Sequence, residues 1–92
     1  MAREIVDNVT RSRYEYAVEE KTSFIDYRRN SGVITLSYAK VPPELEGRGI
    51  GACMVLAALD DIRARGEKVI PQCGFVAAVM RRHPEYQDLL AR

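Results

Sequence analysis

The sequence of 92 residues is poor in the residue types that hold metals and span membranes. It has two cysteines and one histidine, too few for a zinc-type ligand cluster. No apolar run approaches the roughly 18 residues that a membrane span needs. Fourteen basic and thirteen acidic side chains leave a net charge of +1, so no global charge attracts nucleic acid or an anionic membrane. We therefore expect no bound metal, no nucleic-acid partner and no membrane partner.

A targeting signal is also missing from the first ten residues, MAREIVDNVT, which have neither the apolar core of a signal peptide nor a lipidation motif. This favours a cytoplasmic location, where cysteines stay reduced. The composition, 47% hydrophobic and 29% charged, is typical of one small globular domain. We expect a single domain over residues 1–92, present as a monomer or a weak homodimer.

The first half of the chain has the alternation of half-buried strands. Apolar residues recur at every second position in RYEYAV, SFIDYRR and VITLSYA, which cover residues 13–18, 23–29 and 33–39. The turn NSG before the last of these can place Asn30 and Gly32 at positive φ. Two prolines after Val41 end the third strand, because proline lacks the N–H that a strand ladder requires. These features predict an antiparallel meander.

The second half begins with a helical pattern. Apolar residues stand three and four apart over residues 50–65, and Gly66 follows as a C-terminal stop. The early turns are apolar nearly all round, which predicts a helix that is covered on most sides. A short strand (EKVIP), a helix (GFVAAVMRR) and a last short helix from Pro84 complete the chain. This order predicts an α/β or α+β domain with a mixed sheet.

Three glycines, Gly47, Gly49 and Gly51, stand at the start of the first predicted helix. Since glycine inside a helix costs about 1 kcal/mol relative to alanine, they need a reason. One reason is a tight loop that enters a buried helix. The other is a phosphate, which glycines admit to the free N–H groups and the positive dipole end of the helix. The Walker A pattern is not met, and the dinucleotide fingerprint is met only loosely, as Gly47, Gly49 and Ala52.

The stretch from Glu46 to Gly51, EGRGIG, resembles the acetyl-coenzyme A motif of the GNAT superfamily of N-acetyltransferases. That motif has Gln or Arg, two variable residues, Gly, one variable residue, and then Gly or Ala. The segments VPPELEGRGIG, KVIPQCGFV and RRHPEYQDLL are similar to the minimal, stand-alone Yjdj-type N-acetyltransferase domain, and the resemblance extends from about Glu4 to Leu90. It implies a compact GNAT-like fold and the transfer of an acetyl group from acetyl-coenzyme A to an amine of a small molecule or a protein.

The resemblance also implies a coenzyme A site around the glycines. Backbone amides of residues 48–52 would hold the pyrophosphate, and Val41 would offer backbone groups to the pantetheine arm and the thioester carbonyl. The Arg48 side chain either adds charge at the phosphates or is only solvated. The implied binding residues are Val41, Gly47, Arg48, Gly49, Ile50, Gly51 and Ala52.

Two positions depart from the family pattern. Glu46 stands where Gln or Arg is usual, and Lys40 is the cation that could neutralise it. The residues Tyr38-Ala39-Lys40 replace a His-Thr-Glu stretch that often precedes the Val-Pro pair of relatives. If that histidine is a base in relatives, this chain lacks it.

Three side chains are candidates for catalysis: Cys73, Tyr38 and His83. Cys73 precedes the second helix, whose dipole and free amides favour a thiolate, and relatives carry cysteine at the matching position beside the thioester. Packing in the core is the alternative for Cys73 and the expectation for Cys53, which should therefore be alkylated more slowly than Cys73.

Tyr38 shares its strand parity with Leu36, which predicts core packing, with the hydroxyl group near the cleft. His83 precedes Pro84, so its backbone should be extended and its ring can cap the last helix.

Three classes of function remain open. The first is an acetyltransferase, in which the amine attacks the thioester directly or Cys73 first takes the acetyl group. The second is a coenzyme A binding module without turnover, because the chain lacks the helical segment with which larger GNAT enzymes contact acceptors. The third is a small interaction domain whose glycine loop is only structural or binds another nucleotide.

Overall fold

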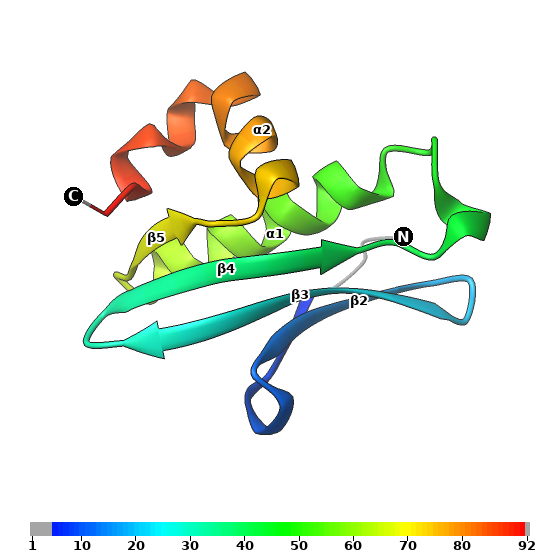
Figure 1. Ribbon diagram of the computed structural model, residues 1–92, viewed down its shortest axis with the longest axis horizontal. Coiled ribbons are helices and arrows are strands. Elements are labelled where there is room, and N and C mark those ends of the chain that lie inside the picture. Colours follow the sequence, from blue (N-terminus) through cyan, green and yellow to red (C-terminus); the bar gives the residue numbers. More distant parts are fainter. Residues whose placement is uncertain (1–4, 92) are drawn as a thin grey trace.

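Five strands form one mixed sheet whose order follows the chain (Figure 1). The computed structural model describes residues 5–91, so the ends of the predicted domain, 1–4 and 92, lie outside the described residues. The elements are β1 (Ile5–Asn8), β2 (Arg13–Val18), β3 (Lys21–Asn30), β4 (Val33–Lys40), α1 (Ile50–Ala64), β5 (Lys68–Pro71) and α2 (Gly74–Arg82), with short 3-10 helices at Val9–Arg11, Pro43–Leu45 and Pro84–Leu89. Strands β1 to β4 are antiparallel, and β5 pairs in parallel with β4. The predicted α+β fold class is confirmed.

Two of the three hairpins, β2–β3 and β3–β4, have two-residue turns between their paired strands. Glu19 and Glu20 have φ values of 52° and 64°, and Ser31 and Gly32 have 51° and 81°. Two successive residues at positive φ match the right-handed twist of the strands that they connect. Of the two residues that tolerate positive φ, Gly32 adopts it, whereas Asn30 is still the last residue of β3 and the turn begins after it.

Strand β4 contains an irregularity that moves Tyr38 out of the core. Asp26 pairs with Tyr38 and the next residue of β3 pairs with Leu36, so Ser37 is an extra residue on β4. Side chains after it switch faces, and Tyr38 is 50% exposed, with its ring centroid 6.1 Å from that of Phe24. The expected core packing of Tyr38 is therefore wrong.

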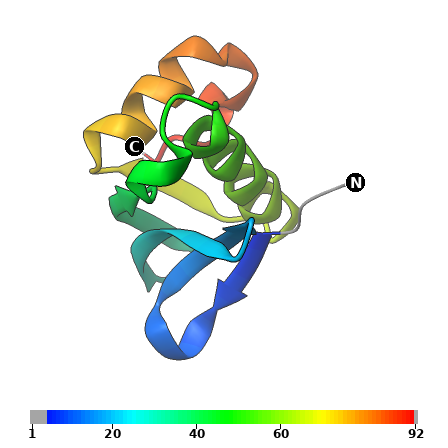
Figure 2. The ribbon, with the colours of Figure 1, turned by 90° about the vertical axis from the view of Figure 1, so that its right-hand side faces the viewer.

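Helix α1 lies across one face of the sheet, and α2 packs against α1, β4 and β5 (Figure 2). The predicted stop at Gly66 is confirmed. Gly66 has φ 73°, its N–H donates to the Arg63 carbonyl, and the Glu67 N–H donates to the Ile62 carbonyl. This pair of bonds is the Schellman arrangement, which satisfies carbonyls at the end of a helix.

A polar network around Arg29 connects the C-terminal half of α1 to the sheet. The Arg29 guanidinium donates to two carboxylates and to two tyrosine hydroxyls, and those hydroxyls donate to Asp7 and Asp61. The partners of Arg29 are Asp7, Tyr14, Tyr27 and Glu67. The network therefore joins β1, β2, β3, α1 and the start of the segment that follows α1.

The network predicts a loss of stability at alkaline pH. Burial and the hydrogen bond to Asp7 raise the pKa of Tyr27 from 10.0 to about 12. A pKa that is raised in the folded state stabilises the fold fully below pH 10.0, and this contribution is lost as the pH rises through about 12. Urea unfolding should show the free energy of unfolding falling over that interval, and Tyr27→Phe should reduce the fall. An unchanged slope in Tyr27→Phe would contradict this assignment.

Candidate functional site

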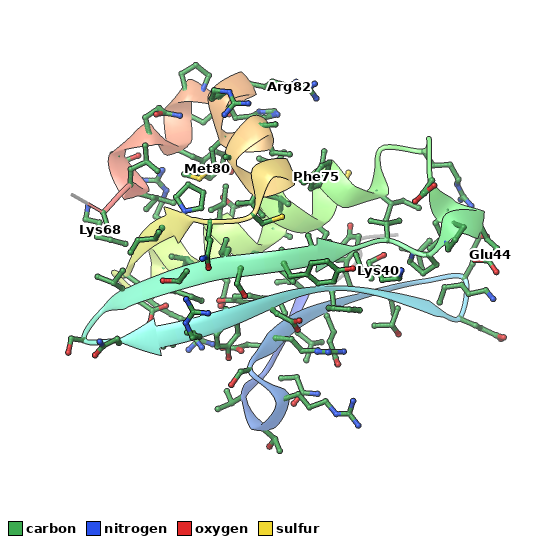
Figure 3. All side chains as sticks on the ribbon, in the orientation of Figure 1. Lys40, Glu44, Lys68, Phe75, Met80 and Arg82 are labelled. Carbon is green, nitrogen blue, oxygen red and sulfur yellow. The ribbon has the colours of Figure 1, made fainter. Side chains whose placement is uncertain are left out.

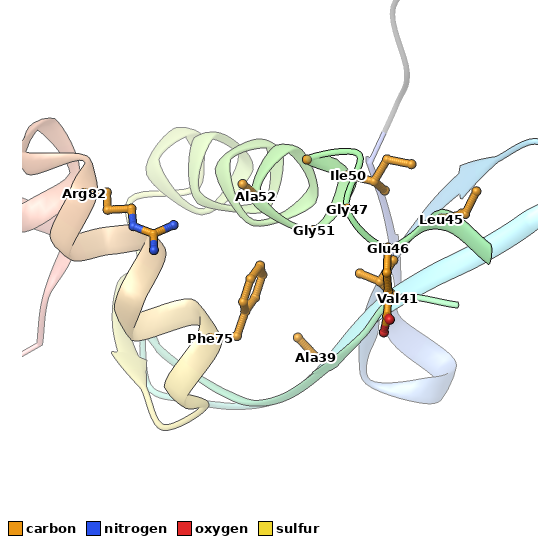
Figure 4. A pocket seen from close by; sticks show the side chains of 11 residues that line it. Ala39, Val41, Leu45, Glu46, Gly47, Ile50, Gly51, Ala52, Phe75 and Arg82 are labelled. Carbon is orange, nitrogen blue, oxygen red and sulfur yellow. The ribbon is translucent and has the colours of Figure 1, made fainter. Parts of the chain in front are cut away.

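A cavity of about 440 Å³ lies between the end of β4, the loop before α1, the start of α1 and one face of α2 (Figure 4). Its volume is within the usual range of small-molecule sites. Six of the seven residues predicted to bind coenzyme A line it, and Arg48 does not. Those six are Val41, Gly47, Gly49, Ile50, Gly51 and Ala52.

The cavity lies at the place where β4 and β5 separate. Strand β5 pairs with β4 over Val33 to Leu36 only, the first half of β4. The last bond between the two segments runs from the Cys73 N–H to the Leu36 carbonyl, at 2.9 Å, and α2 begins immediately afterwards. Backbone groups of residues 37–40 on this edge therefore have no strand partner within the described residues. This leaves the edge available to hydrogen-bond a ligand.

Glycine is favoured at positions 47, 49 and 51 for two different structural reasons. Gly47 and Gly49 have φ values of 82° and 75°, a region that glycine adopts without strain. A Cβ at either position would meet no atom within 4 Å. Gly51 lies inside α1, where a Cβ would be 2.8 Å from the Phe75 ring and 3.3 Å from a methyl group of Val41. The close neighbour of Gly51 is therefore the protein's own Phe75.

The N-terminus of α1 opens onto the cavity. Gly49 is the N-cap and supplies no side-chain hydrogen bond, and the first turn has no acidic residue. The N–H groups of Ile50, Gly51 and Ala52 have no acceptor within the helix, and the helix dipole adds partial positive charge there. An anion at this end of the cavity would meet both.

The loop before α1 is held by ion pairs from the β2–β3 hairpin. The Arg48 guanidinium donates to both carboxylate oxygens of Glu19, at 2.7 and 3.1 Å, and Lys21 pairs with Glu44 at 3.4 Å. Arg48 is thus neither in the cavity nor only solvated. The expected pair between Lys40 and Glu46 is not formed among these described residues, and Glu46 lines the cavity without it.

Two residues that the sequence analysis missed, Phe75 and Arg82, line the cavity from α2. They are seven positions apart, a spacing that places them on one face of a helix, and both extend from the same side of α2 (Figure 3). The seven-residue spacing can be read from the sequence, but it points to the cavity only once α2 is known to face the glycine loop. Arg82 is exposed, and no hydrogen bond or ion pair engages it within the described part of the chain.

The three catalytic candidates do not lie together. Cys73 is half-buried at the N-cap of α2, packs against the core and does not line the cavity. Tyr38 lies two positions after Leu36, whose carbonyl accepts the hydrogen bond from the Cys73 N–H. The backbones of Cys73 and Tyr38 therefore flank the point where the strands separate. Tyr38 alternates along the chain with Ala39 and Val41, which line the cavity, and therefore faces the other side of the sheet.

His83 lies at the opposite end of α2 from Cys73. The nine residues of α2 put roughly 13 Å between the two ends. The expected capping by the His83 ring is wrong, because the side chain makes no cap hydrogen bond and instead lies 3.6 Å from the Glu85 carboxylate.

The expected burial of Cys53 is also wrong, because Cys53 is exposed on α1. The sheet and α2 pack against α1, but part of the helix surface, including Cys53, remains in solvent, so α1 is less covered than its early turns predict. An exposed Cys53 has no reason to be alkylated more slowly than Cys73. The relative alkylation rates of the two cysteines therefore do not show which thiol lies in the cleft.

Among the described residues, no helix is both long enough and apolar enough to cross a membrane. The same residues contain no group of three or more His, Cys, Asp or Glu side chains placed to hold a metal ion.

Comparisons with known proteins identify the family. A solved structure with the same fold is the solution NMR structure of a GCN5-like protein of Staphylococcus aureus with a proposed N-acetyltransferase activity. The TM-score is 0.72 and the identity 24%, over 96% of this chain and 87% of that one. No curated protein matches the chain. The model of the GCN5-related N-acetyltransferase family matches residues 13–89. The chain therefore belongs to the GCN5-related N-acetyltransferase family.

Proposed function

We propose that this protein binds acetyl-coenzyme A in the 440 Å³ cavity and transfers the acetyl group to an amine. The observation that carries the proposal is that the uncapped N-terminus of α1 and the unpaired edge of β4 adjoin one cavity. Backbone N–H groups at a helix N-terminus suit a pyrophosphate. An unpaired strand edge suits the amide groups of a pantetheine arm, which can bond to it as a further strand would.

The lining of the cavity fits this ligand in most respects. Ala39, Val41 and Phe75 offer apolar contact to the arm, and the glycines leave the amides of the loop uncovered. Glu46 fits less well, because a carboxylate repels phosphates and no lysine pairs with it among the described residues. The ligand must therefore lie nearer to the amides of α1 than to Glu46.

The reaction can follow either of two routes. In the direct route, a neutral amine forms a C–N bond with the thioester carbon, the C–S bond breaks, and the amine proton passes to a base while the sulfur leaves as a thiolate. In the two-step route, the Cys73 thiolate forms a thioester with the acetyl carbon while the C–S bond to coenzyme A breaks and its thiolate leaves. The amine then forms a C–N bond with the same carbon, its proton passes to a base, and the Cys73 thiolate is released. Cys73 lies at the separation of β4 and β5, where the thioester would lie, whereas the Tyr38 side chain faces the other side of the sheet and His83 lies at the far end of α2.

The proposed function is tested by incubating the protein with acetyl-coenzyme A and a panel of amines. The panel should include polyamines, lysine-containing peptides and peptides with free N-termini. We expect release of free coenzyme A together with an acetylated amine, detected by mass spectrometry. Binding of coenzyme A without product from any amine would instead favour the binding module, and no binding would refute the proposal.

We propose Cys73 as the nucleophile, which predicts an acetylated intermediate. Acetyl-coenzyme A alone should leave an acetyl group on Cys73, and an added amine should remove it. Cys73→Ser should keep binding but lower turnover on the order of a hundredfold or more, because the hydroxyl group is a much weaker nucleophile. Cys53→Ser is the matched control, since Cys53 is an exposed thiol on α1, whereas Cys73 is hydrogen-bonded to β4 at the point where the strands separate. Turnover at the parent rate in Cys73→Ala would establish the direct route.

A further inference from the structure

Two arginines lie near the glycine loop, and their side chains have different surroundings. Arg48 belongs to the loop itself, but its guanidinium is engaged by both oxygens of Glu19 and stays outside the cavity. Arg82 comes from the last position of α2, lines the cavity and has no partner within the described residues. Arg82 is therefore the arginine available to a ligand, although it lies farther from the glycine loop in sequence.

The position of Arg82 is complementary to the N-terminus of α1. The side chain extends from α2 toward Ala52, on the other side of the cavity (Figure 4). An anion between the two helices would meet backbone N–H groups of residues 50–52 on one side and a guanidinium on the other. Arg82 and Glu46 are the charged residues of the lining, and Glu46 belongs to the loop before α1. The α2 side of the cavity is thus the side that favours a phosphate.

We infer that Arg82 binds the diphosphate of coenzyme A opposite the amides of α1, and that this contact makes the site prefer coenzyme A to pantetheine; the inference rests on the proposed function. Guanidinium groups bind phosphates through paired, charge-assisted hydrogen bonds, which lysine cannot reproduce. Because Arg82 makes no hydrogen bond or ion pair with other described residues, its replacement should remove the ligand contact and leave the fold intact.

The test is isothermal titration of Arg82→Gln with coenzyme A, dephospho-coenzyme A and pantetheine. The second ligand keeps the diphosphate but lacks the 3′-phosphate, and the third lacks all phosphates. The Kd should rise about tenfold for coenzyme A and for dephospho-coenzyme A and stay unchanged for pantetheine. Arg82→Lys should recover part of the loss. Arg81→Gln is the matched control, since it removes the same charge from the neighbouring exposed position, which does not line the cavity.

The other outcomes distinguish a failure of the Arg82 inference from a failure of the proposed function. Unchanged affinity of Arg82→Gln for coenzyme A would refute the inference and leave the proposed function standing. A loss for coenzyme A but not for dephospho-coenzyme A would move the contact to the 3′-phosphate and refute the diphosphate assignment. Equal losses in Arg81→Gln, or for pantetheine, would show a general effect of charge or of cavity shape, which also refutes it. If the parent protein binds no coenzyme A, the proposed function and the inference both fail.

Discussion

Gly49→Val should lower the affinity for coenzyme A by about a hundredfold, through the loss of two or more charge-assisted bonds to phosphate. Gly49 is the N-cap of α1, has φ 75° and lines the cavity. Valine is strained at this φ, so the loop would rearrange and the amides would no longer converge. Its methyl groups would also extend into the open space beside the amides, where a phosphate must approach.

The chain offers a matched control at Gly66, which has φ 73° and open space around its Cβ position, but lies at the far end of α1. Gly49→Val and Gly66→Val should both lower the free energy of unfolding by about 1–2 kcal/mol, the cost of a left-handed residue with a side chain. Only Gly49→Val should lose affinity in isothermal titration. Equal affinities in the two variants would refute the contact between the glycine loop and the phosphates.

Most of the fold was predictable because short sequence patterns mark its strands and single residues mark where its elements end. Alternating apolar residues marked β2, β3 and β4, Gly66 marked the end of α1, and proline marked the ends of β4 and β5. Strand β1 was missed because its four residues, Ile5–Asn8, read IVDN and do not alternate between apolar and polar types. Tyr38 was misplaced because Ser37 is an extra residue on β4, and a pattern of period two cannot reveal such an insertion.

The candidate site was predictable only where it is continuous in sequence. The glycine loop and Val41 form one segment, and a motif could therefore identify them. Phe75 and Arg82 reach the cavity from α2, and Glu19 engages Arg48 from a hairpin turn, so these contacts depend on the tertiary fold. The family is established by the match over residues 13–89, whereas the Yjdj-type subgroup stays a prediction.

The largest loss of stability should follow from Arg29→Met. This change keeps the length of the side chain but removes the guanidinium that donates to two carboxylates and two hydroxyls. The carboxylates of Asp7 and Glu67 are only 7% and 15% exposed, so water cannot replace the lost charge. Removing one partner of a mostly buried ion pair costs about 3–5 kcal/mol. We expect about 3 kcal/mol in urea unfolding, because Arg65 still lies 3.3 Å from Asp7.

The position of this network separates stability from binding. Arg29, on β3, bonds to Glu67 just beyond the C-terminus of α1, whereas the cavity is lined by the N-terminus of α1. The coenzyme A affinity of the folded Arg29→Met protein should therefore equal that of the parent. Arg48→Met is the matched control, since it breaks an exposed ion pair, which contributes little to stability. In the Arg29→Met background, Asp7→Asn should recover part of the loss by removing an unpaired carboxylate, and a double-mutant cycle measures that coupling. If Arg29→Met costs no more than Arg48→Met, or if Asp7→Asn recovers nothing, water reaches these carboxylates and the network does not hold α1 on the sheet.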